Sequence, residues 1–144
     1  MKSSLSHAMI LVRPENMGFY RDLFGFLGWG TIFDGDVGGG LPMLGVSGER
    51  GEGGESLWFA GQVNEATNDY DGPGVNHLAI GTESQADVDE TAAFLTERGV
   101  ELLFETPRHR PEFSSGEGKT YYQIMFASPD RILWEVVYTG PKAG

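Results

Sequence analysis

A faint internal repeat is the feature that most constrains how this chain can fold. His7 opens the segment HAMILV, and His77 opens the segment HLAIGT 70 positions later. A helix-like stretch follows each segment and ends near Gly28 in the first half and near Gly99 in the second. Strand-like segments complete each half, so the order of elements predicts one helix and four strands, twice over. We therefore expect an α+β fold of two βαβββ modules in tandem, with the sheets curved around a central cavity and the helices outside.

Residue patterns within each half support these elements. In the first half, apolar Met17, Tyr20 and Phe24 recur at spacings of three and four, which is typical of one helical face. In the second half, Ser84 is a suitable N-cap, and Gly99 follows the last helical turn. The predicted strands span 5–13, 29–34, 41–46, 56–62, 74–82, 100–106, 121–127 and 132–138, with loops at 35–40, 47–54 and 107–118.

Length and composition favour one globular domain over residues 1–144, with modules at about 5–62 and 74–139 and a linker at 63–73. Hydrophobic residues make up 40% and charged residues 22%, which is ordinary for such a domain. No apolar run approaches the ~18 residues that span a bilayer, and the first residues lack the apolar core of a secretory signal. With no cysteine, the chain has no disulfide and no thiolate ligand. We expect a cytoplasmic protein without a membrane partner.

The net charge of −11 argues against a nucleic-acid partner, because a polyanion would be repelled. The simplest interpretation of this charge is solubility rather than an acidic docking surface. The glycine-rich segment 47–54 lacks the Lys-Ser/Thr pair of a phosphate-binding loop and does not join a strand to a helix. We therefore interpret this segment as a hairpin turn.

Strand alternation places three polar side chains on equivalent faces. These residues are His7 in the first strand, His77 in the fifth and Glu135 in the last. In each strand the residue points away from the face that we assign to the helix. That orientation predicts that all three point to the inside of the curved sheets. The faces assigned to the helices carry Ile10, Ile80 and Trp134.

Glu135 is the most informative of these residues, because it interrupts the apolar strand ILWEVVY. Burial of a lone carboxylate costs several kcal/mol unless a cation or hydrogen bonds compensate it. Two imidazoles and one carboxylate form a triad suited to Fe(II) and similar ions. Alternatively, each histidine could be a packed or surface residue, and Glu135 could lie on an exposed edge or pair with an arginine. The matching repeat positions of His7 and His77 favour a joint metal site.

These residues resemble the vicinal oxygen chelate superfamily, which includes glyoxalase I, extradiol dioxygenases and the fosfomycin and bleomycin resistance proteins. The resemblance covers residues 5–138 and rests on His7, on GFYRDLFG at 18–25, on His77, and on SPD at 128–130 ahead of Glu135. It implies a divalent metal (Fe, Mn, Ni or Zn) held by His7, His77 and Glu135, with Glu135 as a catalytic residue. It also implies a small-molecule substrate and a homodimer.

The sequence departs from two branches of that superfamily. Glyoxalase I has a further carboxylate ligand in the fourth strand, where this chain has SLWFAGQ at 56–62. Extradiol dioxygenases carry a tyrosine four residues before the proline of the last turn and a glycine two residues after it. This chain has Met125 and Arg131 at those positions, and His109 does not match the spacing of the signature histidine, so we interpret it as a surface residue. No motif therefore selects the reaction.

Three functions follow from this reading. The first is a metal-dependent enzyme of the glyoxalase or dioxygenase type, in which the metal chelates neighbouring oxygens of a small substrate and acts as a Lewis acid. The second is a metal-free protein of the bleomycin-resistance type that sequesters a drug or metabolite, since a fold does not fix a function. The third, a structural partner domain, is disfavoured because it gives the triad no purpose. The predicted pocket wall consists of Trp58, Phe59, Tyr122 and Phe126, while Trp29 and Trp134 are further candidates for stacking on a planar ligand.

Overall fold

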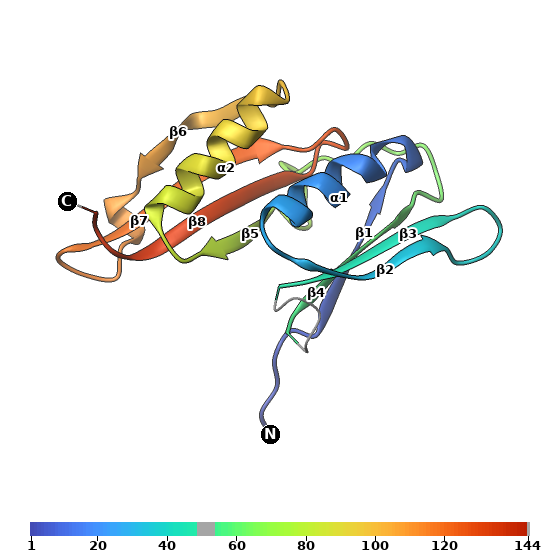
Figure 1. Ribbon diagram of the computed structural model, residues 1–144, viewed down its shortest axis with the longest axis horizontal. Helices are drawn as coiled ribbons and strands as arrows, with labels where there is room; N and C mark the ends of the chain where they lie inside the picture. Colours follow the sequence, from blue (N-terminus) through green and yellow to red (C-terminus); the bar gives the residue numbers. More distant parts are fainter. Residues whose placement is uncertain (49–53, 144) are drawn as a thin grey trace. The chain divides into compact units, whose positions relative to one another are not determined.

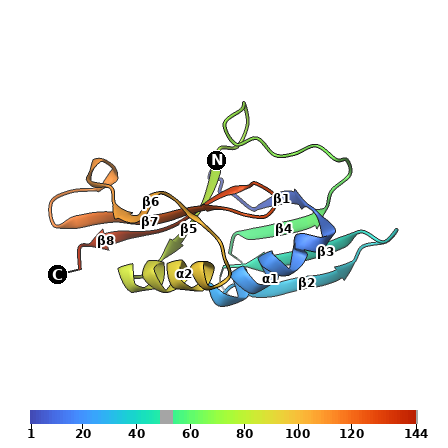
Figure 2. The ribbon, with the colours of Figure 1, turned by 90° about the horizontal axis from the view of Figure 1, so that it is seen from above.

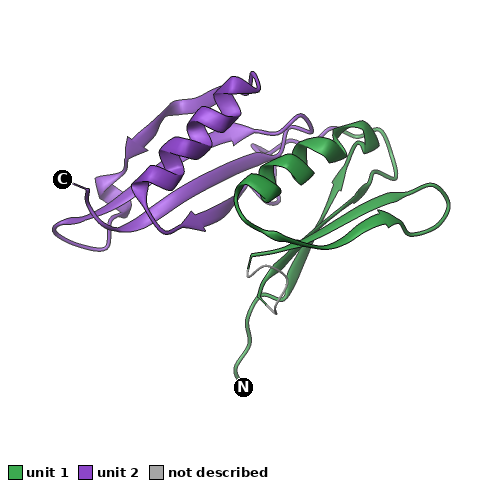
Figure 3. Cartoon of the chain, viewed as in Figure 1, with its two compact units in different colours: residues 1–66 green, residues 67–144 purple. Residues whose placement is uncertain are grey.

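The computed structural model describes residues 1–48 and 54–143, which form two compact units (Figure 1). Unit 1 comprises Met1–Ala66 and unit 2 comprises Thr67–Gly144 (Figure 3). The boundary falls within the predicted linker at 63–73. Within the described residues, each unit contains one four-stranded sheet and one α-helix, which confirms the predicted α+β fold of tandem βαβββ modules.

Unit 1 has a mixed sheet with the strand order β1-β4-β3-β2. The parallel pair is β1 and β4, while β3 pairs in antiparallel fashion with both of its neighbours. Figures 1 and 2 show α1 lying across one face of this sheet. The elements are β1 (His7–Val12), a short 3-10 helix (Pro14–Asn16), α1 (Met17–Phe26), β2 (Gly30–Asp36), β3 (Pro42–Ser47) and β4 (Ser56–Gly61).

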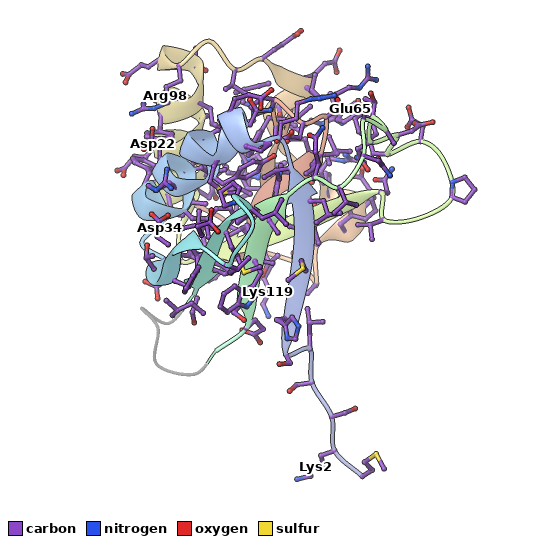
Figure 4. All side chains as sticks on the ribbon, turned by 90° about the vertical axis from the view of Figure 1, so that its right-hand side faces the viewer. Lys2, Asp22, Asp34, Glu65, Arg98 and Lys119 are labelled. Atoms are coloured by element: carbon purple, nitrogen blue, oxygen red, sulfur yellow. The ribbon has the colours of Figure 1, made fainter. Side chains whose placement is uncertain are left out.

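The core of unit 1 lies between α1 and its sheet. Tyr20 stacks on Phe59 with ring centroids 4.4 Å apart, and Phe24 packs on Phe59 at 5.4 Å. All three side chains are fully buried, and the burial of Tyr20 and Phe24 agrees with the helical spacing. Arg21 on α1 donates two hydrogen bonds, of 2.7 and 2.8 Å, to the Asp34 carboxylate on β2, which Figure 4 labels.

Unit 2 repeats this plan with the strand order β5-β8-β7-β6, and β5 and β8 form its parallel pair. Ser84 is the predicted N-cap of α2, since its hydroxyl accepts a hydrogen bond from the Asp87 N–H at 3.1 Å. The elements are β5 (His77–Thr82), α2 (Gln85–Glu97), β6 (Leu102–His109), a short 3-10 helix (Pro111–Phe113), β7 (Lys119–Ala127) and β8 (Leu133–Pro141).

The two faces of the unit 2 sheet differ in chemistry. Phe126 pairs with Trp134 across β7 and β8, and both side chains are fully buried on the face that carries α2. Met125 pairs with Glu135 in the same register, so this pair lies on the opposite face. Within unit 2 the structure therefore agrees with the predicted parity, which assigned Trp134 to the helix side and Glu135 to the other side.

The predicted loop at 107–118 is wrong in its first part, because β6 continues to His109. The pairing of β6 with β7 shifts between Leu103 and Arg108, where Phe104 and Glu105 have φ values of 56° and 58°. This bulge removes the intervening residues from the ladder, so the strand resumes at Arg108, beyond the predicted end at Thr106. Most of the predicted turn at 47–54 lies outside the described residues.

Among the described residues, no helix combines the length and the apolar character needed to cross a membrane.

Candidate functional site

The site in unit 2 is centred on His77 and Glu135, which come from the two parallel strands at one side of the sheet. His77 is aligned with Leu133, two residues before Glu135, so the two side chains share a face. The imidazole Nε2 lies 3.1 Å from the carboxylate Oε2 of Glu135. Glu135 is 2% exposed, whereas the side chain of His77 is 37% exposed. The pair therefore joins a buried carboxylate to an imidazole that solvent reaches.

Asn76 sets the orientation of the His77 ring. The side-chain amide of Asn76 donates a hydrogen bond to the Tyr70 carbonyl at 2.8 Å, which directs its oxygen Oδ1 to His77 Nδ1, also at 2.8 Å. An amide oxygen is only an acceptor, so Nδ1 must carry the hydrogen. In the neutral ring, Nε2 then presents its lone pair toward Glu135.

A lone pair facing a carboxylate oxygen requires a proton or a cation between the two groups, because both atoms are acceptors. The second oxygen of Glu135, Oε1, is buried and has no hydrogen-bond partner among the described residues. Two neighbouring ligands bound at about 2.1 Å on one octahedral metal ion, as in a facial triad, lie about 3 Å apart. The 3.1 Å contact between His77 and Glu135 matches that separation. These two side chains therefore fit a divalent metal, with Asn76 holding the tautomer that binding needs.

A pocket of about 470 Å³ opens beside this pair. Its volume falls within the range of small-molecule sites, and aromatic and aliphatic side chains form much of its wall. All of its lining residues belong to unit 2. They are Tyr70, Asp71, Asn76, His77, Phe104, Arg110, Phe113, Tyr121, Gln123, Met125, Leu133 and Glu135.

Tyr121 places a phenol in the pocket wall. Burial, and then the neighbouring Glu135 carboxylate, raise the pKa of Tyr121 to about 12. The phenol therefore stays protonated at neutral pH and can donate a hydrogen bond. Its ring meets that of Phe113 edge to face, with centroids 5.5 Å apart. One wall of the pocket thus combines a polar donor with apolar surface.

Three of the predicted wall residues lie elsewhere. Phe59 is stacked on Tyr20 in the core of unit 1, and Phe126 is fully buried in the core of unit 2. The hydroxyl of Tyr122 donates to Asp89 on α2 at 2.6 Å, so this ring lies on the helix side of β7. The alternate residues of β7, including Tyr121, line the pocket instead, because successive side chains point to opposite faces.

The tryptophans are distributed in a similar way. Trp134 is 1% exposed in the core of unit 2, so it is not available for stacking on a ligand. Trp29 packs against Phe24 in unit 1 with ring centroids 5.2 Å apart. Trp58 is half-buried and pairs with Met9 and Gly45, on the face of unit 1 opposite to Phe59. Its role as a wall residue stays a prediction.

The other two histidines are not among the residues that line the pocket of unit 2. His7 is exposed at the start of β1 in unit 1, with Nδ1 3.4 Å from the Ser6 hydroxyl. Within residues 1–48 and 54–143, no three His, Asp or Glu side chains form a group that could hold a metal. The role of His7 as a third ligand therefore stays a prediction. His109 is hydrogen-bonded to Thr120 and packs on Tyr122, and it is half-buried rather than a surface residue.

Comparison with known proteins gives one sequence relative and many structural ones. No family model matches the chain. The uncharacterised protein YqjT of Bacillus subtilis is 39% identical over 64 residues, which cover 44% of this chain and 46% of that protein. The match thus spans about half of the curated relative.

Among solved structures, a glyoxalase candidate from Bacillus halodurans superposes with a TM-score of 0.71 and 27% identity, over 93% of this chain and 94% of that one. A glyoxalase/bleomycin resistance protein/dioxygenase domain from Frankia sp. superposes with a TM-score of 0.68 and 21% identity, over 97% of this chain and 100% of that one.

Two further structures share the fold at lower identity. A point mutant of the fosfomycin resistance protein FosX from Listeria monocytogenes, complexed with Mn(II) and 1S,2S-dihydroxypropylphosphonic acid, gives a TM-score of 0.60 and 15% identity, over 96% and 92%. The antibiotic-binding protein TnmS3 from Streptomyces sp. superposes with a TM-score of 0.62 and 20% identity, over 96% of this chain and 98% of that one. Two βαβββ modules and these matches together show that the chain has the fold of the glyoxalase/bleomycin resistance protein/dioxygenase structures, which is the fold expected from its resemblance to the vicinal oxygen chelate superfamily.

Proposed function

We propose that this protein is a divalent-metal-dependent enzyme of the glyoxalase or dioxygenase type, acting on a small substrate with neighbouring oxygens. The metal, which is Fe, Mn, Ni or Zn, is held by His77 and Glu135 of unit 2 together with His7. The observation that carries the proposal is the contact between His77 Nε2 and Glu135 Oε2 at 3.1 Å, beside a buried carboxylate oxygen with no partner among the described residues.

The chain's own residues have distinct roles in this proposal. Glu135 supplies negative charge at the buried end of the pocket, where a cation offsets the cost of burying it. Asn76 fixes the tautomer of His77, and Tyr121 remains a hydrogen-bond donor because the pKa of its phenol is raised to about 12. Met125, which pairs with Glu135 across β7 and β8, and Leu133 add apolar side chains to the wall of the pocket. A divalent ion at this position supplies Lewis-acid chemistry to an oxygenated substrate.

The comparisons support the same class of chemistry. FosX of Listeria monocytogenes has been crystallised with Mn(II) and a dihydroxypropylphosphonic acid, which carries hydroxyls on neighbouring carbons. We extend the superfamily's homodimer to this chain and propose a cytoplasmic location. Sedimentation analysis of the purified protein tests the dimer, and fractionation of cells tests the location.

Metal content is the decisive measurement. Protein purified without a tag under anaerobic conditions, and then loaded with Fe(II), Mn(II), Ni(II) or Zn(II), should hold about one ion per chain by elemental analysis. His7→Ala, His77→Ala and Glu135→Gln should each lose the ion. His109→Gln is the matched control, since His109 contacts Thr120 rather than the pocket, and it should keep the ion. Metal retained in all three ligand variants would overturn the proposal.

A second candidate is a protein that sequesters a planar compound without a metal. It is favoured by Phe104 and Phe113, which line the pocket while being 53% and 56% exposed, more than is usual for such large apolar groups. The antibiotic-binding protein TnmS3 has the same fold. This function predicts no stoichiometric metal, which elemental analysis would detect, and unchanged ligand binding after chelation, which calorimetry would detect.

A further inference from the structure

Gln123 carries a second unsatisfied polar atom in the pocket of unit 2. The side chain lies on β7, on the face shared with Tyr121 and Glu135, and the residue is 2% exposed. Its amide nitrogen Nε2 is buried and has no hydrogen-bond partner among the described residues. A buried donor without an acceptor is costly, so the pocket lacks an acceptor at this position. A ligand oxygen would supply it.

Arg110 brings a positive charge to the same wall. Its backbone N–H donates to the Tyr121 carbonyl at 2.7 Å, which places Arg110, just beyond the end of β6, beside Tyr121 on β7. In the side chain, Nε donates to Glu112 at 2.6 Å, and the guanidinium lies 4.8 Å from the Phe113 ring centroid. No described residue is hydrogen-bonded to Nη1 or Nη2. The guanidinium therefore retains donors for an oxyanion.

The bulge of β6 adds an apolar surface to these donors. Phe104 has a φ of 56°, in the left-handed region that a bulky side chain rarely adopts, and it nevertheless lines the pocket with 53% of its surface exposed. Strain of this kind is concentrated at ligand sites. Phe113, the neighbour of Tyr121, supplies a second exposed ring. Flat apolar groups of a ligand suit such rings.

From these features we propose that the pocket of unit 2 binds a small aromatic carboxylate. Arg110, Tyr121 and Gln123 donate hydrogen bonds to the carboxylate, and Phe104 and Phe113 contact the ring. Gln123 and Arg110 are therefore specificity-determining residues of the site. A guanidinium fork is matched to a planar carboxylate, which favours this anion over a neutral amide or alcohol.

The inference rests on the proposed function, since it names the substrate class of the same site. Without a metal, the lining residues include two carboxylates, Asp71 and Glu135, and one guanidinium. A divalent cation at Glu135 would make the charge of this wall net positive. An aromatic carboxylate should then bind more tightly to the loaded protein than to the metal-free protein.

Benzoate is the probe, and binding is measured by calorimetry and by NMR of the side-chain amide of Gln123. We expect saturable benzoate binding to the full chain, with a shift of that amide signal, and weaker binding of benzamide and acetate. Benzamide keeps the ring without the charge, and acetate keeps the charge without the ring. Equal affinity for benzoate and benzamide would overturn the proposed anion, and equal affinity for benzoate and acetate would overturn the proposed ring contact.

Matched variants separate the contacts. Arg110→Gln and Gln123→Met should each weaken benzoate binding by about tenfold or more, since hydrogen bonds to charged groups are the strong ones. Arg108→Gln is the control, because Arg108 lies only two residues before Arg110, pairs with Glu105 at 3.5 Å and does not line the pocket. Circular dichroism checks that each variant is folded. Unchanged affinity in both folded variants would overturn the inference.

The two proposals fail in different ways. Benzoate binding that depends on Arg110, in a protein that never holds a metal, would support the substrate class and overturn the metal enzyme. A stoichiometric metal with no benzoate binding would leave the proposed function in place and overturn this inference.

Discussion

Two residues of the site lower the stability of the folded state. Gln123 buries an amide nitrogen that has no partner among the described residues, and Glu135 does the same with a carboxylate oxygen. An unsatisfied buried polar atom costs about 1–3 kcal/mol. Both atoms border one pocket, on neighbouring strands. Such a cost is expected where binding, rather than folding, has selected the residue.

Gln123→Met should therefore stabilise the protein while it weakens ligand binding. Methionine is similar in length and apolar, so the free energy of unfolding should rise by about 1 kcal/mol as the unsatisfied donor is removed. Urea denaturation followed by circular dichroism measures the change. A loss of stability would mean that the amide already has a partner in solution.

Asn76→Ala tests the positioning of His77. Loss of an outer hydrogen bond to a metal-binding histidine usually weakens metal affinity by about 10–100-fold. Asn68→Ala is the control, because Asn68 also lies in the segment before β5 but donates to the Arg131 carbonyl at 2.9 Å. Nitrogen chemical shifts of the His77 imidazole report its tautomer, which should change only in Asn76→Ala. An unaltered tautomer and metal affinity would refute the assigned role.

At the scale of elements, β7 carries two adjacent phenols on opposite faces. The pKa values of Tyr121 and Tyr122 are both raised to about 12, chiefly by burial, with further contributions from Glu135 and Asp89 respectively. The unfolded chain therefore releases these protons at lower pH than the folded chain. Stability should be unaffected below pH 10, and should fall progressively as the pH rises toward about 12.

Spectroscopic titration of tyrosinate absorbance checks this expectation. Tyr121 and Tyr122 should ionise late, and Tyr121→Phe and Tyr122→Phe should each remove one late phenol and part of the alkaline loss of stability. Ionisation of both at the ordinary pH would contradict the burial described for β7.

The bulge in β6 gives a prediction about backbone strain. Glu105 has a φ of 58°, and its carboxylate is largely exposed beside Arg108 at 3.5 Å. The left-handed region costs about 1–2 kcal/mol for a residue with a Cβ, while glycine enters it freely at some cost in chain entropy. Glu105→Gly should therefore raise the free energy of unfolding by up to about 1 kcal/mol in thermal denaturation. Destabilisation by a similar amount would place this residue outside the left-handed region in solution.

Local patterns predicted most elements but not the contacts between strands. Spacing of apolar residues marked α1, and Ser84 marked the start of α2, because these signals act within a few residues. The alternation of side chains along β8 placed Glu135 and Trp134 on opposite faces of the sheet for the same reason. The choice between Tyr121 and Tyr122 as a pocket residue depends on the register of β7 against β8, which sequence neighbours do not determine. The bulge that carries β6 past Pro107 is equally non-local.

For the whole molecule, metal binding and stability should be linked. A ligand present at one hundred times its dissociation constant stabilises the folded state by about 2.7 kcal/mol. We expect this gain in thermal denaturation of the loaded protein and its reversal by a chelator. Glu135→Gln should abolish the gain, whereas His109→Gln should retain it. Equal stabilisation of Glu135→Gln would show that the ion binds elsewhere.

The position of β8 in its sheet has a consequence for biosynthesis. Among the strands of unit 2, β8 is the last to leave the ribosome, yet it lies between β5 and β7 in the sheet. Until β8 has been synthesised, β5 has no partner strand in its sheet, and His77 lies on an unpaired strand without Glu135. A nascent chain stalled before β8 would therefore present unpaired backbone to chaperones and could not assemble the site. The contact between His77 and Glu135 can therefore form only after β8 has been translated.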